Sequence, residues 1–324
     1  MKKILLLDTS IATFNIGDEI INDSIKQNWP ELFLKNYIAT YPVHTPPYSW
    51  WQQLFFSKKY TNLQNVDYKF LCGTNSLYTN MFRPFPGWNI YPWNSTFLKN
   101  TILLGVGAGI NSKKVNFYTQ KMYRKVLSKD YIHSVRDSYT EDLLNSLGYK
   151  AINTGCPTLW GLTSDFCKGI PMEKADNVLF TLTGKQPDFN NDKLMIEILS
   201  KNYKELYFWP QTISDLDYLN SLGDFRYNLV APNLSAYDDI LTQNIDYVGS
   251  RLHGGIRALQ HAKRSLIISI DYRAENMGSN YSLPILKRED IAVNLEARIN
   301  TSRKTEINGL DFSAINKWKS QFEI

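Results

Sequence analysis

The amino-acid sequence predicts an α/β fold with two domains. Its 324 residues suffice for about two domains of ordinary size. Segments of strand character alternate with segments of helical period in two successive series, which is typical of βαβ units around parallel sheets. Between Thr163 and Asn177 the alternation gives way to Ser, Asp, Gly, Pro and Lys residues, as in a linker. These observations predict two Rossmann-like domains facing a cleft, at residues 1–165 and 176–324.

The first predicted domain begins with a strand at Lys3–Asp8. A helix follows from about Asp18 to Trp29, and Asp18 is its expected N-cap because a short carboxylate side chain accepts from the free amides there. The next expected elements are a strand that ends near Cys72, a strand at 101–106, a helix at 117–127 and a strand at 132–135. A last helix is expected to begin at a capping box formed by Ser138 and Glu141 and to end at Gly148.

The second predicted domain repeats the pattern and ends with a helix. Its strands are expected at 178–182, 206–209, 227–230, 247–249 and 266–270. One helix is expected to open at Ser235 and Asp238, and another just after Gly254. In such sheets ligands bind outside the carboxyl ends of the strands, so candidate residues are sought there.

The composition favours a globular protein with a small anionic ligand. Hydrophobic residues make up 43% and charged residues 21%, which excludes a disordered or fibrous chain. The 36 basic and 31 acidic residues give a net charge of +5 without a dense basic tract, which argues against a nucleic-acid partner. Aromatic residues reach 14%, and their rigid amphipathic rings suit flat polar ligands such as sugars.

The cysteines and the apolar segments predict a cytoplasmic protein. Cys72, Cys156 and Cys167 form no CxxC pair, so neither a disulfide framework nor a zinc site is expected. The first apolar run ends at Leu7, which is short for a secretion signal and predicts a strand. The apolar stretch at 101–110 is likewise too short to cross a bilayer. The protein is therefore expected to be soluble, or at most peripheral to a membrane.

The stretch from Tyr247 to Arg257 is the most informative motif. A strand delivers Ser250, Arg251 and His253 to its carboxyl end, and two glycines, at 254 and 255, are expected to open a helix with free amides. Such a site can bind an anion, because the guanidinium of Arg251 can fork onto phosphate or carboxylate. The imidazole of His253 can exchange protons near neutral pH. The alternative is a structural salt bridge of the arginine and a capping histidine.

Three further motifs follow predicted strands. Arg136 stands at a strand end before a helix, where it either binds an anion or pairs with Asp137. Asp18, with Asn15 and Gly17 before it, holds a sugar hydroxyl, acts as a base, or simply caps its helix. Gly107 belongs to a GxGxG sequence, which allows an acceptor to approach or a helix to pack closely but is a weak dinucleotide signal.

Two aromatic loops, at 48–56 and 82–93, carry four of the eight tryptophans. Their rings either stack under a saccharide or touch a membrane, or else pack against their own domain. These tryptophans are Trp50, Trp51, Trp88 and Trp93. Lys185 and Gln211 follow strands of the second domain and are expected to line the cleft. The histidines at 44, 133 and 261 lack metal-ligand spacing and are expected to be structural or exposed.

Taken together, these motifs resemble those of the polysaccharide pyruvyl transferase family, whose members are similar to two-domain glycosyltransferases of the GT-B type. The element Gly249-Ser-Arg-Leu-His-Gly254 is the specific one. The other matching elements, in order along most of the chain, are Asn15-x-Gly-Asp18, Val135-Arg-Asp137 with Leu143 to Gly148 behind it, Thr154-Gly-Cys-Pro157 and Ile268-Ser-Ile-Asp-Tyr-Arg273.

The resemblance implies an enzyme that transfers pyruvate from phosphoenolpyruvate, as a ketal, onto two hydroxyls of one sugar in a capsule or exopolysaccharide precursor. No cofactor or metal is implied. Arg251, His253 and Arg136 are then expected to be catalytic, with His253 as the acid and base. The full expected donor site is Arg251, Leu252, His253, Gly254, Gly255, Arg136 and Lys185, and the expected acceptor site is Asn15, Gly17, Asp18, Gly107 and Trp88. The expected acceptor is a lipid-linked oligosaccharide at the inner face of the cell membrane.

The sequence departs from the family pattern at two positions. Cys156 stands where an acidic residue is common, which bears on substrate choice if this position touches the acceptor. Residues 260–264 replace the usual Gly-x-Pro, and Lys263 and Arg264 are expected to be exposed. Two rival functions remain open: a glycosyltransferase with a nucleotide-sugar donor, and a catalytically silent glycan-binding protein of the same fold.

Overall fold

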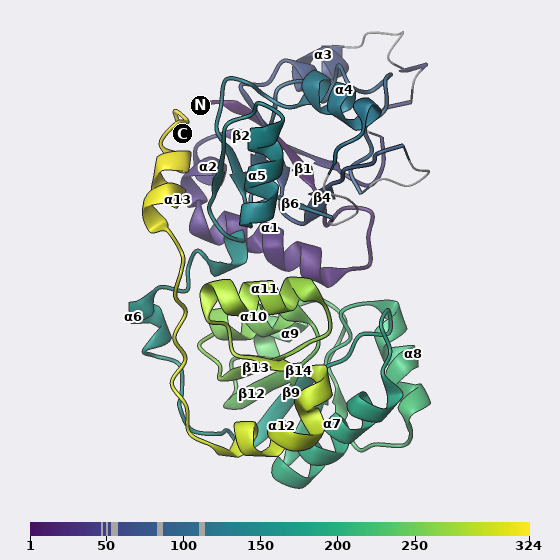
Figure 1. Ribbon diagram of the computed structural model, residues 1–324, viewed down its shortest axis with the longest axis vertical. Coiled ribbons are helices and arrows are strands. Elements are labelled where there is room, and N and C mark those ends of the chain that lie inside the picture. The colour runs from purple at the N-terminus through teal and green to yellow at the C-terminus, as the bar shows by residue number, and fades with distance from the viewer. Residues whose placement is uncertain (47, 50, 53–57, 83–86, 110–113) are drawn as a thin grey trace. The chain divides into compact units, whose positions relative to one another are not determined.

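The computed structural model describes residues 1–46, 48–49, 51–52, 58–82, 87–109 and 114–324 (Figure 1). Its internal contacts divide the chain into two compact units. Unit 1 consists of residues 1–13, 21–160 and 311–324, and unit 2 of residues 14–20 and 161–310. The expected division at 1–165 and 176–324 differs from this mainly at the C-terminus, which belongs to unit 1.

Unit 1 is built on a parallel sheet with the order β2-β1-β3-β5. These strands are β1 (Lys3–Asp8), β2 (Tyr37–Pro42), β3 (Tyr68–Cys72) and β5 (Thr101–Leu104). Two short pairs accompany it, β4 (Asn75–Leu77) with β6 (Gly107–Ala108), and β7 (His133–Val135) with β8 (Ala151–Asn153). Its helices are α1 (Ile16–Asn28), whose first residues belong to unit 2, α2 (Pro30–Leu34), α3 (Lys58–Gln64), α4 (Phe117–Val126), α5 (Ser138–Ser146) and α13 (Phe312–Lys319).

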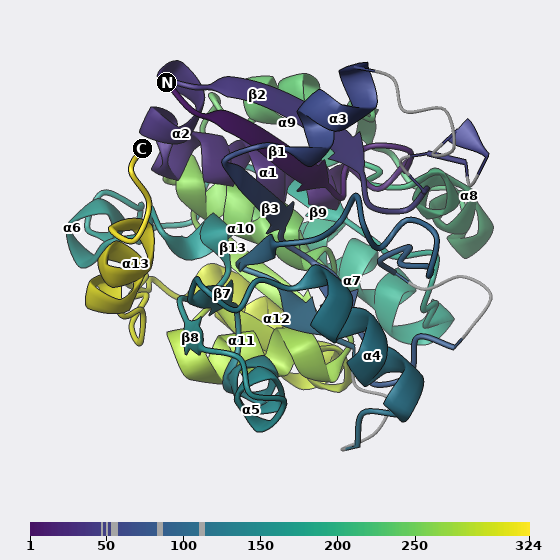
Figure 2. The ribbon, with the colours of Figure 1, turned by 90° about the horizontal axis from the view of Figure 1, so that it is seen from above.

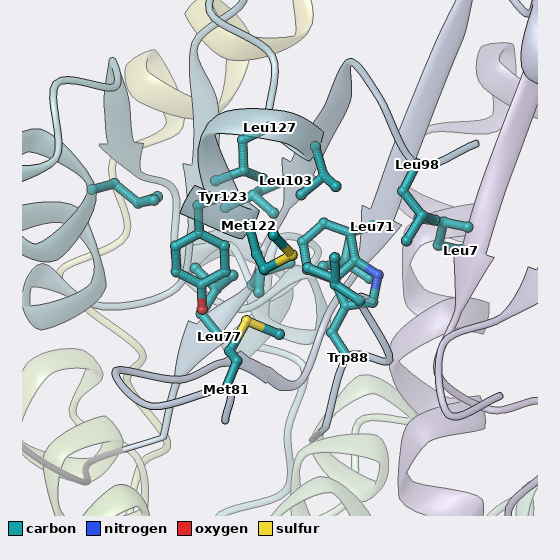
Figure 3. Packing of buried hydrophobic residues seen from close by; sticks show 14 of the residues in the cluster. Leu7, Leu71, Leu77, Met81, Trp88, Leu98, Leu103, Met122, Tyr123 and Leu127 are labelled. Carbon is teal, nitrogen blue, oxygen red and sulfur yellow. The ribbon is translucent and has the colours of Figure 1, made fainter. Parts of the chain in front are cut away.

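Both faces of the unit 1 sheet are covered by apolar clusters. Because alternate residues of a strand point to opposite faces, each strand contributes to both clusters. Along β1, Leu5 and Leu7 join one core cluster, whereas Ile4 and Leu6 join another. Figure 3 shows the first cluster, in which the ring of Trp88 lies among leucines and methionines. A short run of apolar residues therefore forms a buried strand here, as the sequence predicted.

The C-terminal helix α13 packs into the second cluster. The indole of Trp318 is fully buried and lies 5.3 Å, centroid to centroid, from that of Trp29. Figure 2 shows α13 beside β7 and β8. These aromatic contacts explain why residues 311–324 belong to unit 1 although residues 161–310 precede them.

Unit 2 is built on a six-stranded parallel sheet with the order β11-β10-β9-β12-β13-β14. The strands are β9 (Asn177–Thr181), β10 (Glu205–Phe208), β11 (Asn228–Leu229), β12 (Ile245–Gly249), β13 (Ser265–Ser269) and β14 (Ile285–Lys287). The helices are α6 (Ser164–Cys167), α7 (Phe189–Asn202), α8 (Ile213–Leu222), α9 (Leu234–Ile240), α10 (Leu252–Gln260), α11 (Tyr272–Tyr281) and α12 (Ile291–Asn300).

The strand order of unit 2 reverses between β9 and β12. After β9 the chain builds β10 and β11 on one side, and it then returns to build β12, β13 and β14 on the other. Such a reversal leaves a crevice outside the carboxyl ends of the two central strands, because their following loops run in opposite directions. The segments after Thr181 and Gly249 occupy this position.

Several helix starts differ from those predicted. Helix α1 begins at Ile16, so Asp18 lies in its first turn and is not the N-cap. Helix α5 is capped by Asp137, whose carboxylate accepts from the Thr140 amide at 2.7 Å, and not by Ser138. The expected end of α5 is confirmed, because Gly148 follows it with φ +83°.

Helices α9 and α10 also begin earlier than predicted. Asn233, and not Ser235, caps α9 through the Ala236 amide. Helix α10 begins at Leu252, so the glycines at 254 and 255 lie inside its first turn and do not open it. The N-cap positions are thus Asn233 for α9 and Arg251 for α10, each upstream of the predicted start. The free amides of the first turn therefore belong to earlier residues than expected.

Candidate functional site

Arg251 stands at the carboxyl end of β12, beside the strand-order reversal of unit 2. Its Nε donates to the Leu182 carbonyl and to Asp215, both at 3.0 Å. Its Nη2 donates to Thr212 Oγ1 at 2.8 Å and to the second oxygen of Asp215. The structural salt bridge considered in the sequence analysis is therefore present.

This pairing determines which part of the guanidinium a ligand can reach. The Nε and Nη2 edge is occupied by Asp215, so a fork onto phosphate or carboxylate cannot use this edge. Within the part of the chain that the structure describes, Nη1 donates to no acceptor, and 11% of the side chain is exposed. Arg251 thus offers a ligand one oriented nitrogen with two N–H groups.

Helix α10 begins directly after Arg251 and has no side-chain cap. The amides of Leu252 and Gly254 donate to no acceptor among the described residues, so the positive end of the helix is available to an anion. His253 is half-buried in the same turn. The side chain of Leu252 is buried, which leaves its amide as the group that can meet a ligand.

Of the two glycines of this turn, Gly255 is required by packing, whereas Gly254 only borders its neighbours closely. A Cβ on Gly255 would overlap the side chains of Ile267 and Tyr247, so only glycine lets α10 lie this close to the sheet. A Cβ on Gly254 would stand 3.3 Å from the Tyr247 hydroxyl and 3.6 Å from the Trp209 ring. Close packing thereby brings the helix terminus to the strand ends.

Four buried polar atoms at the same sheet edge have no hydrogen-bond partner among the described residues. They follow or end β10, β12 and β13, and they are Trp209 Nε1, Gln211 Oε1, Ser250 Oγ and Ser269 Oγ. A buried polar atom without a partner costs about 1–3 kcal/mol. Their concentration at one edge indicates that this edge binds ordered water or a ligand.

The residues expected near this edge are distributed as follows. Lys185 is exposed in the loop after β9 and takes part in no ion pair among the described residues. Gln211 Nε2 donates to Asn15 Oδ1 at 2.8 Å. Asn15 also holds the first turn of α1, where its Nδ2 donates to Asp18 at 3.0 Å and its Oδ1 accepts from the Gly17 amide at 3.3 Å.

Arg136 lies in unit 1, at the carboxyl end of β7. Only 4% of it is exposed, and it donates to Asn75 Oδ1. Its Nε lies 3.8 Å from the Asp137 carboxylate. A Cβ on Gly107 would overlap both Arg136 and Asn75, so this glycine provides the space for the buried guanidinium.

The aromatic loops of unit 1 contain both buried and exposed rings. Trp88 is 1% exposed and belongs to the core, so its position agrees with the packing alternative and leaves no ring face for a sugar. Trp93 is exposed and stacks on Tyr91 with centroids 4.6 Å apart. Trp51 is also exposed, and Trp50 lies outside the described residues.

Each departure from the family pattern includes a buried residue, and Lys263 in the second departure is half-buried, not exposed. Cys156 has no exposed surface and accepts from Thr158 Oγ1 at 3.1 Å, so its side chain cannot touch an acceptor in this structure. Arg264 is 3% exposed and donates to Asp246 at 2.9 Å and to carbonyls at the end of α12. The expectation that Arg264 is exposed is therefore wrong.

His133 is a structural histidine, as expected. It is completely buried in β7; its Nδ1 accepts from the Leu103 amide at 3.1 Å, and Nε2 lies 2.9 Å from the Ser128 carbonyl. These contacts suit the neutral imidazole with a proton on Nε2. Burial lowers the pKa of His133 to about 4, because the charged form loses its hydration.

The sequence analysis did not identify Asp215. Its side chain is fully buried at the start of α8, where it completes a capping box with Thr212 and also holds Arg251. The capping pattern Thr212-x-x-Asp215 was visible in the sequence. The ion pair was not, since 36 residues separate the partners.

Across the described residues, no three His, Cys, Asp or Glu side chains are grouped so that they could hold a metal ion. The helices of the described chain are all too short or too polar to span a bilayer.

Comparison with solved structures shows the fold. The chain is similar to the UDP-GlcNAc 2-epimerase of Methanocaldococcus jannaschii, determined in complex with UDP-GlcNAc and UDP, with a TM-score of 0.50, 11% identity, and coverage of 99% of this chain and 100% of that one. MurG of Acinetobacter baumannii is matched with a TM-score of 0.38, 9% identity, and coverage of 99% and 94%. The chain is thus an α/β protein with two Rossmann-like domains of the GT-B type.

The family follows from the sequence itself. The model of the polysaccharide pyruvyl transferase family matches residues 15–272, which is most of the chain. The protein belongs to this family, and the resemblance inferred from its motifs is confirmed. A comparison with curated proteins gives no significant match.

Proposed function

We propose that this family member transfers the pyruvyl group of phosphoenolpyruvate, as a ketal, onto two hydroxyls of one sugar in a cell-surface polysaccharide precursor. The observation that carries the proposal is the edge of unit 2 where Arg251 Nη1, the uncapped start of α10 and the unpartnered Ser250 Oγ occur together. A helix start and a guanidinium suit a phosphate.

The proposed donor site uses backbone and side chains of one turn. The amides of Leu252 and Gly254 and Arg251 Nη1 bind the phosphate, and Gly255 keeps this turn against the sheet. Lys185, exposed in the loop after β9, is proposed to meet the second negative group of the substrate. Arg136 is proposed as a further anion-binding residue, supported by its place at a strand end before a helix.

The reaction balances without a cofactor. One sugar hydroxyl adds to C2 of phosphoenolpyruvate while C3 gains a proton and becomes a methyl group. The second hydroxyl then attacks C2, the C2–O bond to phosphate breaks, and the second hydroxyl proton leaves with phosphate. We assign His253 as the group that delivers the proton to C3 and accepts a hydroxyl proton, a role that contributes about 10²–10⁴-fold in rate.

The acceptor is proposed to be a lipid-linked oligosaccharide on the cytoplasmic side of the membrane. Asn15, Gly17 and Asp18 are proposed to supply hydroxyl-binding groups at the start of α1. Gly107, whose open side is filled by Arg136 and Asn75, is left out of this proposal. Exposed aromatic residues of unit 1, among them Trp51, Phe82 and Phe117, support peripheral membrane contact.

Two measurements on candidate lipid-linked acceptors test the function. We expect phosphate release from phosphoenolpyruvate that depends on the acceptor, and an acceptor product whose mass increases by pyruvic acid minus one water. Transfer from a nucleotide sugar without phosphoenolpyruvate consumption would favour the glycosyltransferase alternative. Acceptor binding without consumption of either donor would favour a silent glycan-binding protein.

A further inference from the structure

We infer that Asp215 is a positioning residue that orients the Arg251 guanidinium toward the donor; this inference rests on the proposed function. The carboxylate has no exposed surface and accepts from Arg251 Nε at 3.0 Å and from Nη2. A carboxylate that binds this edge of a guanidinium fixes both its plane and its direction.

Asp215 also joins the loops that follow three strands of the sheet. After β9, the Gly184 amide donates to it at 3.1 Å. After β10, the amides of Gln211 and Thr212 donate to it at 3.1 and 3.0 Å. After β12 comes Arg251 itself. One buried charge thus organises the sheet edge at which the donor is proposed to bind.

These contacts exceed what capping of α8 requires. A capping box is complete with the Thr212 hydroxyl and its amide as partners. The additional bonds from Gly184 and Arg251 come from distant segments. The Leu182 carbonyl and the Thr212 hydroxyl accept from the same guanidinium, so only Nη1 points away from these contacts. Asp215 therefore determines which nitrogen meets the donor.

The test compares Asp215→Asn with a matched variant, Asp238→Asn. Asp238 is the partner of a second arginine of unit 2, Arg257, which donates to it from Nε at 2.8 Å and Nη2 at 2.6 Å. Both variants remove one negative charge from an arginine pair, and both are expected to lower the melting temperature. Only Asp215→Asn is expected to raise KM for phosphoenolpyruvate, by about 10–100-fold, because charge-assisted contacts of the donor lose their orientation.

A double-mutant cycle separates positioning from general loss of structure. In the Arg251→Ala background, Asp215→Asn is expected to raise KM for phosphoenolpyruvate far less than in the wild-type protein, because no guanidinium remains to be oriented and only the loop contacts are lost. If the two substitutions instead raise KM independently, the inference is overturned. An equal rise of KM in Asp238→Asn would overturn it as well.

If Asp215→Asn does not fold, Thr212→Val provides the same test, because it removes the hydroxyl that accepts from Arg251 Nη2. Its expected effect is a rise of about threefold in KM that also disappears in the Arg251→Ala background. A rise that persists there contradicts the inference. If Asp215→Asn turns over phosphoenolpyruvate like the wild-type enzyme with an unchanged KM, the role of Asp215 is overturned and the proposed function is not. If the wild-type protein itself consumes no phosphoenolpyruvate, the proposed function is overturned and this inference with it.

Discussion

Arg251 and Arg136 occupy the same position in sequence terms, at the end of a strand and before a helix, yet their surroundings differ. Arg251 is held on one edge by a carboxylate and precedes an uncapped helix. Arg136 donates to the neutral Asn75 side chain and lies 3.8 Å from the carboxylate of Asp137, which already caps the first turn of the following helix. From this comparison we expect anion binding to depend on whether the helix terminus is satisfied, and not on the arginine alone.

The largest expected effect comes from His253, which has no counterpart beside Arg136. His253→Ala is expected to lower kcat about 10²–10⁴-fold and to change the affinity for the acceptor little, because proton transfer is lost while a single hydroxyl contact contributes little to binding. The measurement is steady-state phosphate release with acceptor binding by calorimetry. His261→Ala is the control, since His261 caps the other end of α10 and pairs with Asp238 at 3.1 Å. A kcat within tenfold of wild type would exclude His253 as the acid and base.

The two arginines are expected to differ in their effect on donor affinity. Arg251→Ala should weaken phosphoenolpyruvate binding about 100-fold, as expected for the loss of charge-assisted hydrogen bonds. Arg136→Ala should weaken it about tenfold at most, because its guanidinium is buried and already bonded to Asn75. Calorimetric titration of both variants checks this order. Equal losses would show that the helix caps do not distinguish the two positions.

The protein is also expected to lose stability in acid, because of His133 in β7, the strand that Arg136 follows. Folded His133 has a pKa of about 4 and an unfolded histidine about 6.5, so between these values the unfolded state binds more protons. Stability is therefore highest above pH 6.5 and falls by about 3 kcal/mol as the pH drops to 4. Urea unfolding at pH 7.5 and 4.5 measures the loss. In His133→Asn most of this pH dependence should disappear; if it persists, other groups cause it.

The smallest expected effect is that of removing Asp137, the side-chain cap that α5 has and α10 lacks. Asp137→Ala should lower the free energy of unfolding by about 1 kcal/mol, because the Thr140 amide loses its acceptor. It should change KM for phosphoenolpyruvate less than twofold. Denaturant unfolding and steady-state kinetics test both statements. A large rise in KM would mean that Asp137 contributes to donor binding and that the contrast with Arg251 is incomplete.

The sequence predicted most strands of the two main sheets, because short apolar runs bounded by polar residues leave few alternatives. It did not predict the edge strands β2 and β14 or the short strands β4, β6 and β8. It placed Arg251 at the carboxyl end of its strand, where the structure has it. Helix starts were less predictable, since several nearby side chains can serve as caps. For α5 the sequence predicts a cap at Ser138, whereas the structure has Asp137 in this position.

Long-range packing could not be predicted from local patterns. Trp88 and the exposed Trp93 belong to the same aromatic loop, and only the folded core determines which ring is buried. The ion pair between Asp215 and Arg251 and the return of α13 to unit 1 likewise depend on segments far apart in the chain. These are the features that decide how the candidate site is held.

A crystal structure of the protein with phosphoenolpyruvate would show directly whether the start of α10 binds the donor. We expect the phosphate within hydrogen-bond distance of Arg251 Nη1 and of the amides that begin α10, with His253 near C3 of the substrate. Phosphoenolpyruvate bound away from the carboxyl edge of the unit 2 sheet, or absent at a concentration that supports turnover, would contradict it.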